Sequence, residues 1–288
     1  MKSLILASES GFQKPKRKVS IFAYVFLTLF SLLSIFPLYW LFVVSSNSNE
    51  EISKIPPSVI PGPNFFKQLD AVYAAVPFTN AIINTILVSF VVAIFQVFFC
   101  SLAGFAYAKM QFPGKRGSLL VIIGTMMLPA QLGIVVLYIM MANYFHWIDD
   151  FKALVVPSMV TAFGVFWMRQ IIDTQIPSEV LEAAKIDGAK NLRIYRSIVM
   201  PIIAPSVTVL GLFGFLGTWN DFLWPTLVLN SPTRFTVQVA VNQLNGTYTM
   251  DYALKMCGAF MATLPLLILF AFVGKKLVSG IMDGAVKG

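Results

Sequence analysis

Six apolar stretches, each long enough to cross a lipid bilayer, constrain the fold of this 288-residue chain more than any other feature. A membrane-spanning helix needs about 20 consecutive, mostly apolar residues. The six stretches are Ile21–Val44, Ala81–Tyr107, Leu119–Met141, Ala153–Ile172, Val207–Leu229 and Ala253–Val278. They predict an all-α membrane protein with six transmembrane helices. The expected organisation is an N-terminal segment over residues 1–20 and a single transmembrane domain over residues 21–288.

The composition agrees with a membrane protein and excludes several other classes. Hydrophobic residues make up 57% of the chain and charged residues only 12%. In soluble domains, apolar residues average about 45–50% and charged residues about 25%. Disorder, a collagen-like fibre and an ordinary cytosolic enzyme are therefore excluded. The two cysteines, Cys100 and Cys257, lie inside apolar runs and are expected to be buried thiols, not a disulfide framework or a metal site.

The basic residues predict one orientation in the membrane. The first run follows a basic segment, but it is too long for a signal peptide and no Ala-x-Ala site follows it, so a retained first helix is expected. If the six runs are helices, 16 of the 21 Lys and Arg residues fall on one side of the membrane. That side is expected to be the cytoplasm, with both termini on it, in a multi-pass protein of a bacterial-type inner membrane. The basic residues occupy four separate segments, which disfavours binding of nucleic acid.

Helix-breaking residues lie inside several runs. They include Pro129, Pro157 and Pro265, and three glycines at a spacing of three, Gly211, Gly214 and Gly217. Two interpretations stay open. The glycines allow close helix packing, or the kinked helices line a pathway that opens to either side. No internal repeat of the kind found in many secondary transporters is evident.

The loop over residues 173–205, between the fourth and fifth runs, is the most informative segment. Ser178 is a candidate N-cap of a short helix, and Gly188 is its expected C′ residue. A second short helix, Leu192–Met200, is expected to lead to Pro201. Alanines give the first helix a smooth face that suits docking into a groove on a partner. Glu182 and Asp187 are five positions apart, which makes them a poor catalytic pair.

The same loop carries a family pattern. Its sequence is Glu-Ala-Ala-x-x-Asp-Gly-Ala, then eight residues, then Ile-x-x-Pro. This resembles the EAA motif of ABC importer permeases, matched by Glu182, Ala183, Ala184, Asp187, Gly188, Ala189, Ile198 and Pro201. The resemblance implies the type I ABC importer permease fold, with this loop as the coupling helix in a cleft of a separate ATP-binding subunit. The alternative is an amphipathic surface helix without a partner.

Further segments resemble the carbohydrate branch of these permeases, the MalG-like, binding-protein-dependent family. They are residues 104–115, 219–225, 258–265 and 278–288. The resemblance implies a heterodimer with a second homologous permease, two ATP-binding subunits, an extracytoplasmic solute-binding protein and a carbohydrate substrate. It also implies that the C-terminal tail, residues 279–288, reaches the ATPase through Gly284, Ala285, Val286, Lys287 and Gly288. Asp283 departs from the pattern, since many relatives have a small or hydroxyl residue there.

No residues of the chain suggest catalysis or a cofactor. There is no Gly-x-x-x-x-Gly-Lys-Ser/Thr sequence, so ATP and Mg²⁺ are expected to bind the partner ATPase. The lone His146 is a poor metal ligand without Cys or carboxylate neighbours in the pattern. We therefore expect a transporter subunit with no catalytic, cofactor or metal site of its own.

Polar residues inside apolar runs are candidates for the transport pathway or for contact with the binding protein. Asp221 is the clearest, beside Asn220 and between Trp219 and Trp224. Either this group contacts a sugar, or the tryptophans mark the outer interface and Asp221 pairs with a neighbouring helix or the binding protein; we favour the second interpretation. Weaker candidates, for which interhelical hydrogen bonding is the default role, are Asn80, Asn84, Gln96 and Gln131.

The favoured function is thus that of a permease subunit in an ATP-driven carbohydrate importer. The alternative from another class is a stand-alone, ion-coupled secondary transporter, which needs a relay of ionisable residues at the midplane. Asp221 is nearly alone in that role. A membrane-embedded enzyme would need a nucleophile and base or a metal constellation, and the sequence contains none.

Overall fold

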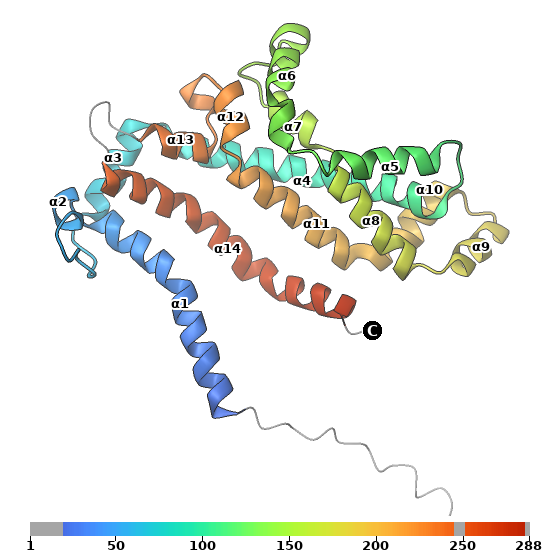
Figure 1. The fold of residues 1–288 in the computed structure, drawn as a ribbon, viewed down its shortest axis with the longest axis horizontal. Coiled ribbons are helices and arrows are strands. Elements are labelled where there is room, and N and C mark those ends of the chain that lie inside the picture. Colours follow the sequence, from blue (N-terminus) through green and yellow to red (C-terminus); the bar gives the residue numbers. More distant parts are fainter. Residues whose placement is uncertain (1–19, 245–250, 286–288) are drawn as a thin grey trace, which may run out of the picture.

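A computed structural model describes residues 20–244 and 251–285, and every regular element in these residues is helical (Figure 1). The α-helices are α1 Ile21–Ser46, α2 Asn49–Ile52, α3 Phe65–Ala75, α4 Phe78–Lys109, α5 Lys115–Thr125, α6 Ile134–Ile139, α7 Lys152–Ser158, α8 Ala162–Gln175, α9 Ser178–Ile186, α10 Asn191–Ile194, α11 Met200–Asn220, α12 Leu223–Val228, α13 Val237–Gln243 and α14 Tyr252–Ala285. Short 3₁₀ segments lie at Ala130–Gly133 and Pro232–Arg234, and π-helical segments at Met140–Phe145 and Tyr195–Val199.

Five helical segments of the described residues are long and apolar enough to cross a membrane. They are Ile21–Ser46, Phe78–Lys109, Lys152–Gln175, Asn191–Asn220 and Tyr252–Gly274. Because the chain carries five such segments, it is a multi-pass membrane protein. The predicted N-terminal segment lies almost entirely outside the described residues.

The third predicted span, Leu119–Met141, is not one helix. Helix α5 ends at Thr125, and a second apolar segment runs over Gln131–Phe145. Pro129 lies in the break and forms the N-cap of the 3₁₀ turn. A proline has no N–H to donate, and it disfavours helical backbone in the residue before it, so a helix ends there. Neither half reaches the length that a single crossing needs.

The fifth predicted span also has different bounds. The helical segment begins at Asn191, not Val207, and ends at Asn220, while α12 follows as a separate helix. The predicted short helix Leu192–Met200 is therefore the first part of this longer one. The π-helical segment Tyr195–Val199 ends two residues before Pro201, which cannot donate a backbone hydrogen bond, and the helix continues through this proline.

The other two prolines behave differently from each other. Pro157 precedes a break over residues 159–161, after which Thr161 caps α8 by accepting a hydrogen bond from the Gly164 N–H at 3.1 Å. Pro265 lies inside α14, which continues without a break. Proline thus interrupts the predicted helices at positions 129 and 157 but not at 265.

Helix α4 is the central element, packed against α8 and α11, while α14 packs against α1 and α11 (Figure 1). Glycines permit the close approach. A Cβ at Gly104 would lie 2.7 Å from Cβ of Met168 and 2.8 Å from the backbone nitrogen of Arg169. A Cβ at Gly214 would overlap Oε1 of Gln96, whereas one at Gly217 would meet nothing within 4 Å. Close packing therefore explains Gly214 but leaves Gly217 for another role.

The buried apolar residues form two clusters. One joins α3, the start of α4, α12, α13 and α14 around Phe78, Trp219 and Val237. The other joins α4, α8 and the start of the long helix around Met168, Ile172 and Tyr195. Both cysteines are buried free thiols, as predicted, with one in each cluster. The molecule therefore has a core toward each end of its long axis.

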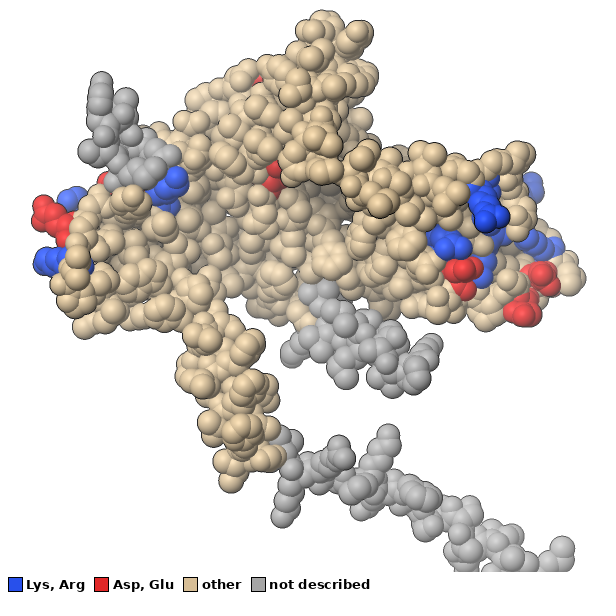
Figure 2. All heavy atoms as spheres, in the orientation of Figure 1, with Lys and Arg blue, Asp and Glu red and all other residues tan. Residues whose placement is uncertain are grey.

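Charged side chains gather at the two ends of the view in Figure 2, and the middle shows very few. Helices α9 and α10 lie at one end and α2 and α3 at the other (Figure 1). The most hydrophobic part of α1 is not buried within the chain, so its apolar side chains need lipid or another polypeptide as neighbours.

Candidate functional site

The predicted coupling helix is α9, which projects from the body of the protein at one end (Figure 1). Leu181 is its only buried residue and fastens it to the second apolar cluster. Of the motif residues on and just after α9, Ala184 and Ala189 are half-buried, and the exposed ones are Glu182, Ala183, Asp187 and Gly188. The motif thus lies mainly on a surface that this chain leaves uncovered.

The end of α9 has the geometry that the sequence predicted. Gly188 adopts a φ of +80°, which a residue with a side chain rarely adopts. The Ala189 N–H donates to the Ala184 carbonyl at 2.9 Å, and the Gly188 N–H donates to the Lys185 carbonyl at 3.0 Å. These two bonds form a Schellman motif. The predicted N-cap is wrong by one position, because Pro177 is the N-cap and Ser178 is the first helical residue.

The exposed face of the loop combines apolar side chains with free carboxylates. Ile186 is 87% exposed and Leu192 is 71% exposed. Within the described residues, the side chains of Glu182 and Asp187 form no hydrogen bond and no ion pair. Exposed apolar side chains and unpaired carboxylates on one loop are typical of a surface that another protein covers.

The rest of the motif lies away from α9. Ile198 is half-buried in the π-helical segment, and Pro201 is exposed at the start of α11. Both residues lie near the N-terminal end of the long helical segment Asn191–Asn220. The motif therefore joins the projecting loop to a membrane-spanning segment. In the predicted tail, Gly284 and Ala285 belong to the last turn of α14. Val286, Lys287 and Gly288 lie outside the described residues.

A polar groove lies where the two apolar clusters meet. It consists of two adjoining hollows of about 440 and 770 Å³ that share Pro157, Ser158 and Asp221. The smaller hollow extends past Thr161 to Gln96, and the larger extends to Gln131. Volumes of this size suit a small organic ligand.

Asp221 stands at the junction of the two hollows. Its Oδ1 accepts a long hydrogen bond of 3.4 Å from the Trp224 N–H, and no ion pair to it occurs among the described residues. Trp219 is 1% exposed, and Trp224 donates its Nε1 hydrogen to the Ala153 carbonyl at 2.8 Å. These tryptophans are core residues, and their position at the membrane interface stays a prediction.

Of the remaining predicted pathway residues, one lines the groove and two do not. Gln131 lines the larger hollow. Asn84 donates from Nδ2 to the carbonyls of Thr233 at 2.9 Å and Phe235 at 3.1 Å, and thereby ties α4 to a loop. Asn220 is exposed and donates to the Leu216 carbonyl of its own helix at 2.9 Å. Neither asparagine lines the groove, and their contact with a binding protein stays a prediction.

Sequence reasoning missed Ser158 and Thr161 and ranked Gln96 as a weak candidate. Gln96 is 6% exposed; its Nε2 donates to Oγ1 of Thr161 at 3.1 Å, and its Oε1 is buried without a hydrogen-bond partner. The available signal was the pair of hydroxyl residues around Pro157, because a broken helix exposes polar groups inside a membrane only where they line a cavity.

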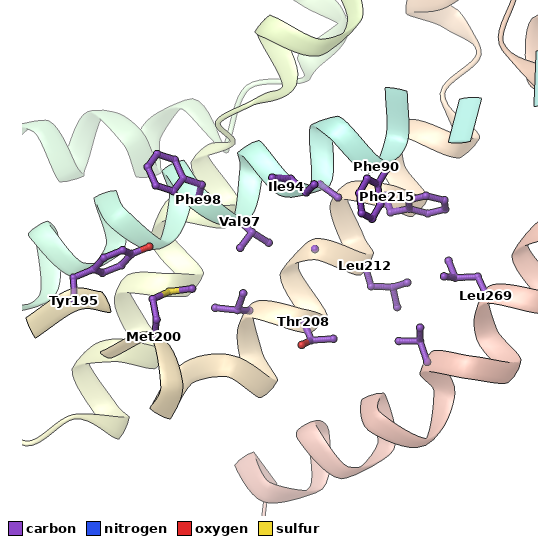
Figure 3. Close-up of a pocket in the computed structure, with 14 residues that line it drawn as sticks. Phe90, Ile94, Val97, Phe98, Tyr195, Met200, Thr208, Leu212, Phe215 and Leu269 are labelled. Carbon is purple, nitrogen blue, oxygen red and sulfur yellow. The ribbon is translucent and has the colours of Figure 1, made fainter. Parts of the chain in front are cut away.

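A third hollow, of about 470 Å³, is apolar and differs from the groove (Figure 3). It lies between α4, α11 and α14, with Phe90, Ile94, Val97 and Phe98 on one side and Leu212 and Leu269 on the other. Lipid chains or an apolar helix fit such a surface. It offers few polar groups that could orient a hydrophilic solute.

Asp149 fastens two loops together outside the spans. Its Oδ1 accepts from the N–H groups of Asn230 and Ser231, both at 2.9 Å, and its Oδ2 lies 3.8 Å from Nε of Arg234. Partial burial raises the pKa of the Asp149 carboxyl. The hydrogen bonds from Ser231 and Asn230 and the Arg234 charge outweigh it, so this pKa lies below its usual value.

A multi-pass helical protein with a projecting loop helix and a polar groove between its helices has the features of a transporter's membrane subunit. The comparison with known families makes this specific. Residues 3–280 match the family described as binding-protein-dependent transport system inner membrane component, and the chain belongs to this family.

Individual relatives cover nearly the whole chain. The maltodextrin transport permease MdxG of Bacillus subtilis is 32% identical, covering 92% of this chain and 95% of its own. The arabinooligosaccharide transport permease AraQ of Halalkalibacterium halodurans is 28% identical over 95% of this chain and all of its own. The glycerol-3-phosphate transport permease UgpE of Yersinia pestis is 26% identical over 93% and 98%.

One solved structure has the same fold. It is a bacterial ABC transporter involved in the import of the acidic polysaccharide alginate, and it aligns with a TM-score of 0.74 at 21% identity. The alignment covers 88% of this chain and 95% of the other.

Proposed function

We propose that this chain is one permease half of an ATP-driven importer that takes a carbohydrate from an extracytoplasmic binding protein. Membership of the family supports the binding-protein-dependent mechanism. The transport of arabinooligosaccharides, maltodextrin and lactose by relatives supports a carbohydrate as the solute. The glycerol-3-phosphate relatives keep a phosphorylated solute as a second candidate.

In this proposal the chain has both termini in the cytoplasm and six membrane segments, the third formed jointly by α5 and Gln131–Phe145. A second homologous permease completes the pathway. Two separate ATPase subunits bind ATP and Mg²⁺, and this chain hydrolyses nothing itself. The loop over residues 173–205 and the tail Gly284–Gly288 contact those subunits.

The observation that carries the proposal is the uncovered surface of α9, where the motif residues are held by a Schellman motif at Gly188. A groove on an ATPase that grips this surface can push on the helical segment Asn191–Asn220, which the loop enters directly. Nucleotide state would then bias a bundle that has two arrangements, which is the physical requirement for coupling at a distance.

The test is the replacement Gly188→Val, measured as ATP-dependent uptake by cells that carry the complete transporter. Left-handed backbone costs an ordinary residue roughly 1–2 kcal/mol, so uptake should fall about tenfold or more. Gly117→Val is the matched control, because a side chain at either glycine meets nothing within 4 Å and only Gly188 has a positive φ. Unchanged uptake in Gly188→Val would count against coupling through this loop.

A second measurement separates the alternative class. Uptake after ATP depletion, with the ion gradient maintained, should stop in the proposed importer. Uptake that continues under these conditions would favour an ion-coupled transporter that uses Asp221.

A further inference from the structure

The charge of the residues that line the polar groove bears on the charge of the solute that can pass through it. Of the described residues that line the two hollows, Asp221 is the only charged one, and no Lys, Arg or His is among them. The polar groups that accompany it are uncharged: Gln96, Gln131, Ser158, Thr161 and Thr218. The wall that this chain contributes therefore carries a net negative charge and no group that could neutralise an anion.

The same wall offers the chemistry that a sugar requires. The carboxylate of Asp221 can accept hydrogen bonds from hydroxyl groups, and the bond that it accepts from the Trp224 N–H is long, at 3.4 Å. The buried Oε1 of Gln96 has no partner. Two aromatic side chains in the smaller hollow, Phe163 and Phe213, are 45% and 52% exposed, and each packs on Trp167. Exposed ring faces can pack on the C–H faces of a pyranose or furanose ring.

Gly217 adds a second observation. It lines the groove, and a side chain there would meet nothing within 4 Å, so close helix packing does not explain the glycine. Its absent side chain keeps the passage next to Asp221 wide.

We infer that the groove over Gln96, Thr161 and Asp221 is this chain's wall of the solute path, and that it favours neutral polyhydroxylated solutes over anionic ones, with Asp221 setting the charge preference. The inference rests on the proposed function for the existence of a path. It separates neutral sugars and oligosaccharides from uronates and phosphorylated solutes.

The sharpest test measures the charge of the groove without knowing the solute. Gly217→Cys places a thiol in the groove, while the native Cys100 and Cys257 are buried. In the purified, reconstituted complex, a cationic methanethiosulfonate reagent should modify this thiol at least tenfold faster than an anionic reagent of similar size. The ratio at the exposed control Val59→Cys gives the reference.

Removing the charge should remove the preference. In Gly217→Cys combined with Asp221→Asn, the ratio of the two rates should fall to the Val59→Cys reference. If that double variant does not assemble, the single variant measured from about 0.1 M to about 1 M salt serves instead, because the Debye length falls from about 10 Å to about 3 Å and the ratio should fall with it. Equal rates in the single variant at low salt, or faster anionic modification, overturn the inference.

Uptake separates this inference from the proposed function. Cells with and without the gene are given labelled maltotriose, arabinotriose, trigalacturonate and glycerol-3-phosphate. Chain-dependent uptake of a neutral oligosaccharide supports both statements. Chain-dependent uptake of an anionic solute overturns the charge preference and leaves the importer proposal standing, and ATP-independent uptake overturns the proposed function.

Discussion

At the scale of single residues, Asp149 shows how one carboxylate can order two loops. It accepts hydrogen bonds from two consecutive backbone N–H groups, those of Asn230 and Ser231. Nothing in the sequence paired Asp149 with residues 81 and 82 positions away, because the pairing depends on where α12 ends. Gly188 is the opposite case, because its left-handed conformation can be predicted from the local sequence alone, in which a glycine follows a short amphipathic helix.

The hydrogen bonds that Asn230 and Ser231 donate to Asp149, here called the Asp149 latch, make the stability of the folded protein depend on pH in a defined direction. The pKa of Asp149 is lower in the folded protein than the unfolded value of about 3.9, so the stabilisation is complete above that value and is lost as the pH falls through the folded pKa. Hydrogen exchange should show the amides of Asn230 and Ser231 losing protection in acid. Asp149→Asn should weaken the latch by about 1–3 kcal/mol at neutral pH. The exposed Asp70→Asn should leave these amides protected; equal protection in both variants would contradict the latch.

At the scale of elements, the helices could be predicted and their interruptions only in part. Apolar length located the first, second, fourth and sixth spans within a few residues, whereas the fifth was misplaced at both ends and the third is not one helix. The sequence locates the prolines, but whether a proline breaks its helix depends on the neighbouring residues. The helix breaks at Pro129, whereas α14 continues through Pro265. The groove could not be foreseen, because Gln96, Thr161 and Asp221 come from three segments that only tertiary packing brings together.

The packing of α4 on α8 leads to a prediction about two glycines. Gly104→Ala should destabilise the protein by about 1–3 kcal/mol, because the new Cβ meets backbone atoms that cannot move aside. Gly217→Ala is the matched helical control and should have little effect on packing. Thermal unfolding of the purified protein in detergent measures the difference. Equal transition temperatures would show that α4 and α8 can separate without cost.

At the scale of the whole molecule, the orientation in the membrane can be tested at its two charged ends. Ile186→Cys and Val59→Cys place thiols at residues that are 87% and 60% exposed, against a background of buried native cysteines. A membrane-impermeant maleimide should label Val59→Cys in intact spheroplasts and Ile186→Cys only in inside-out vesicles. The reverse pattern would show that the positive-inside argument fails for this chain.

The helical segment Asn191–Asn220 joins the two parts of the candidate site: it begins three residues after Gly188 and ends one residue before Asp221. Its 30 residues correspond to about 45 Å of helix. A helix resists changes in its length, so a displacement at one end is transmitted along its axis to the other end. We expect a pull on the loop and a change in the groove to be one event with one rate constant, without a lag between them.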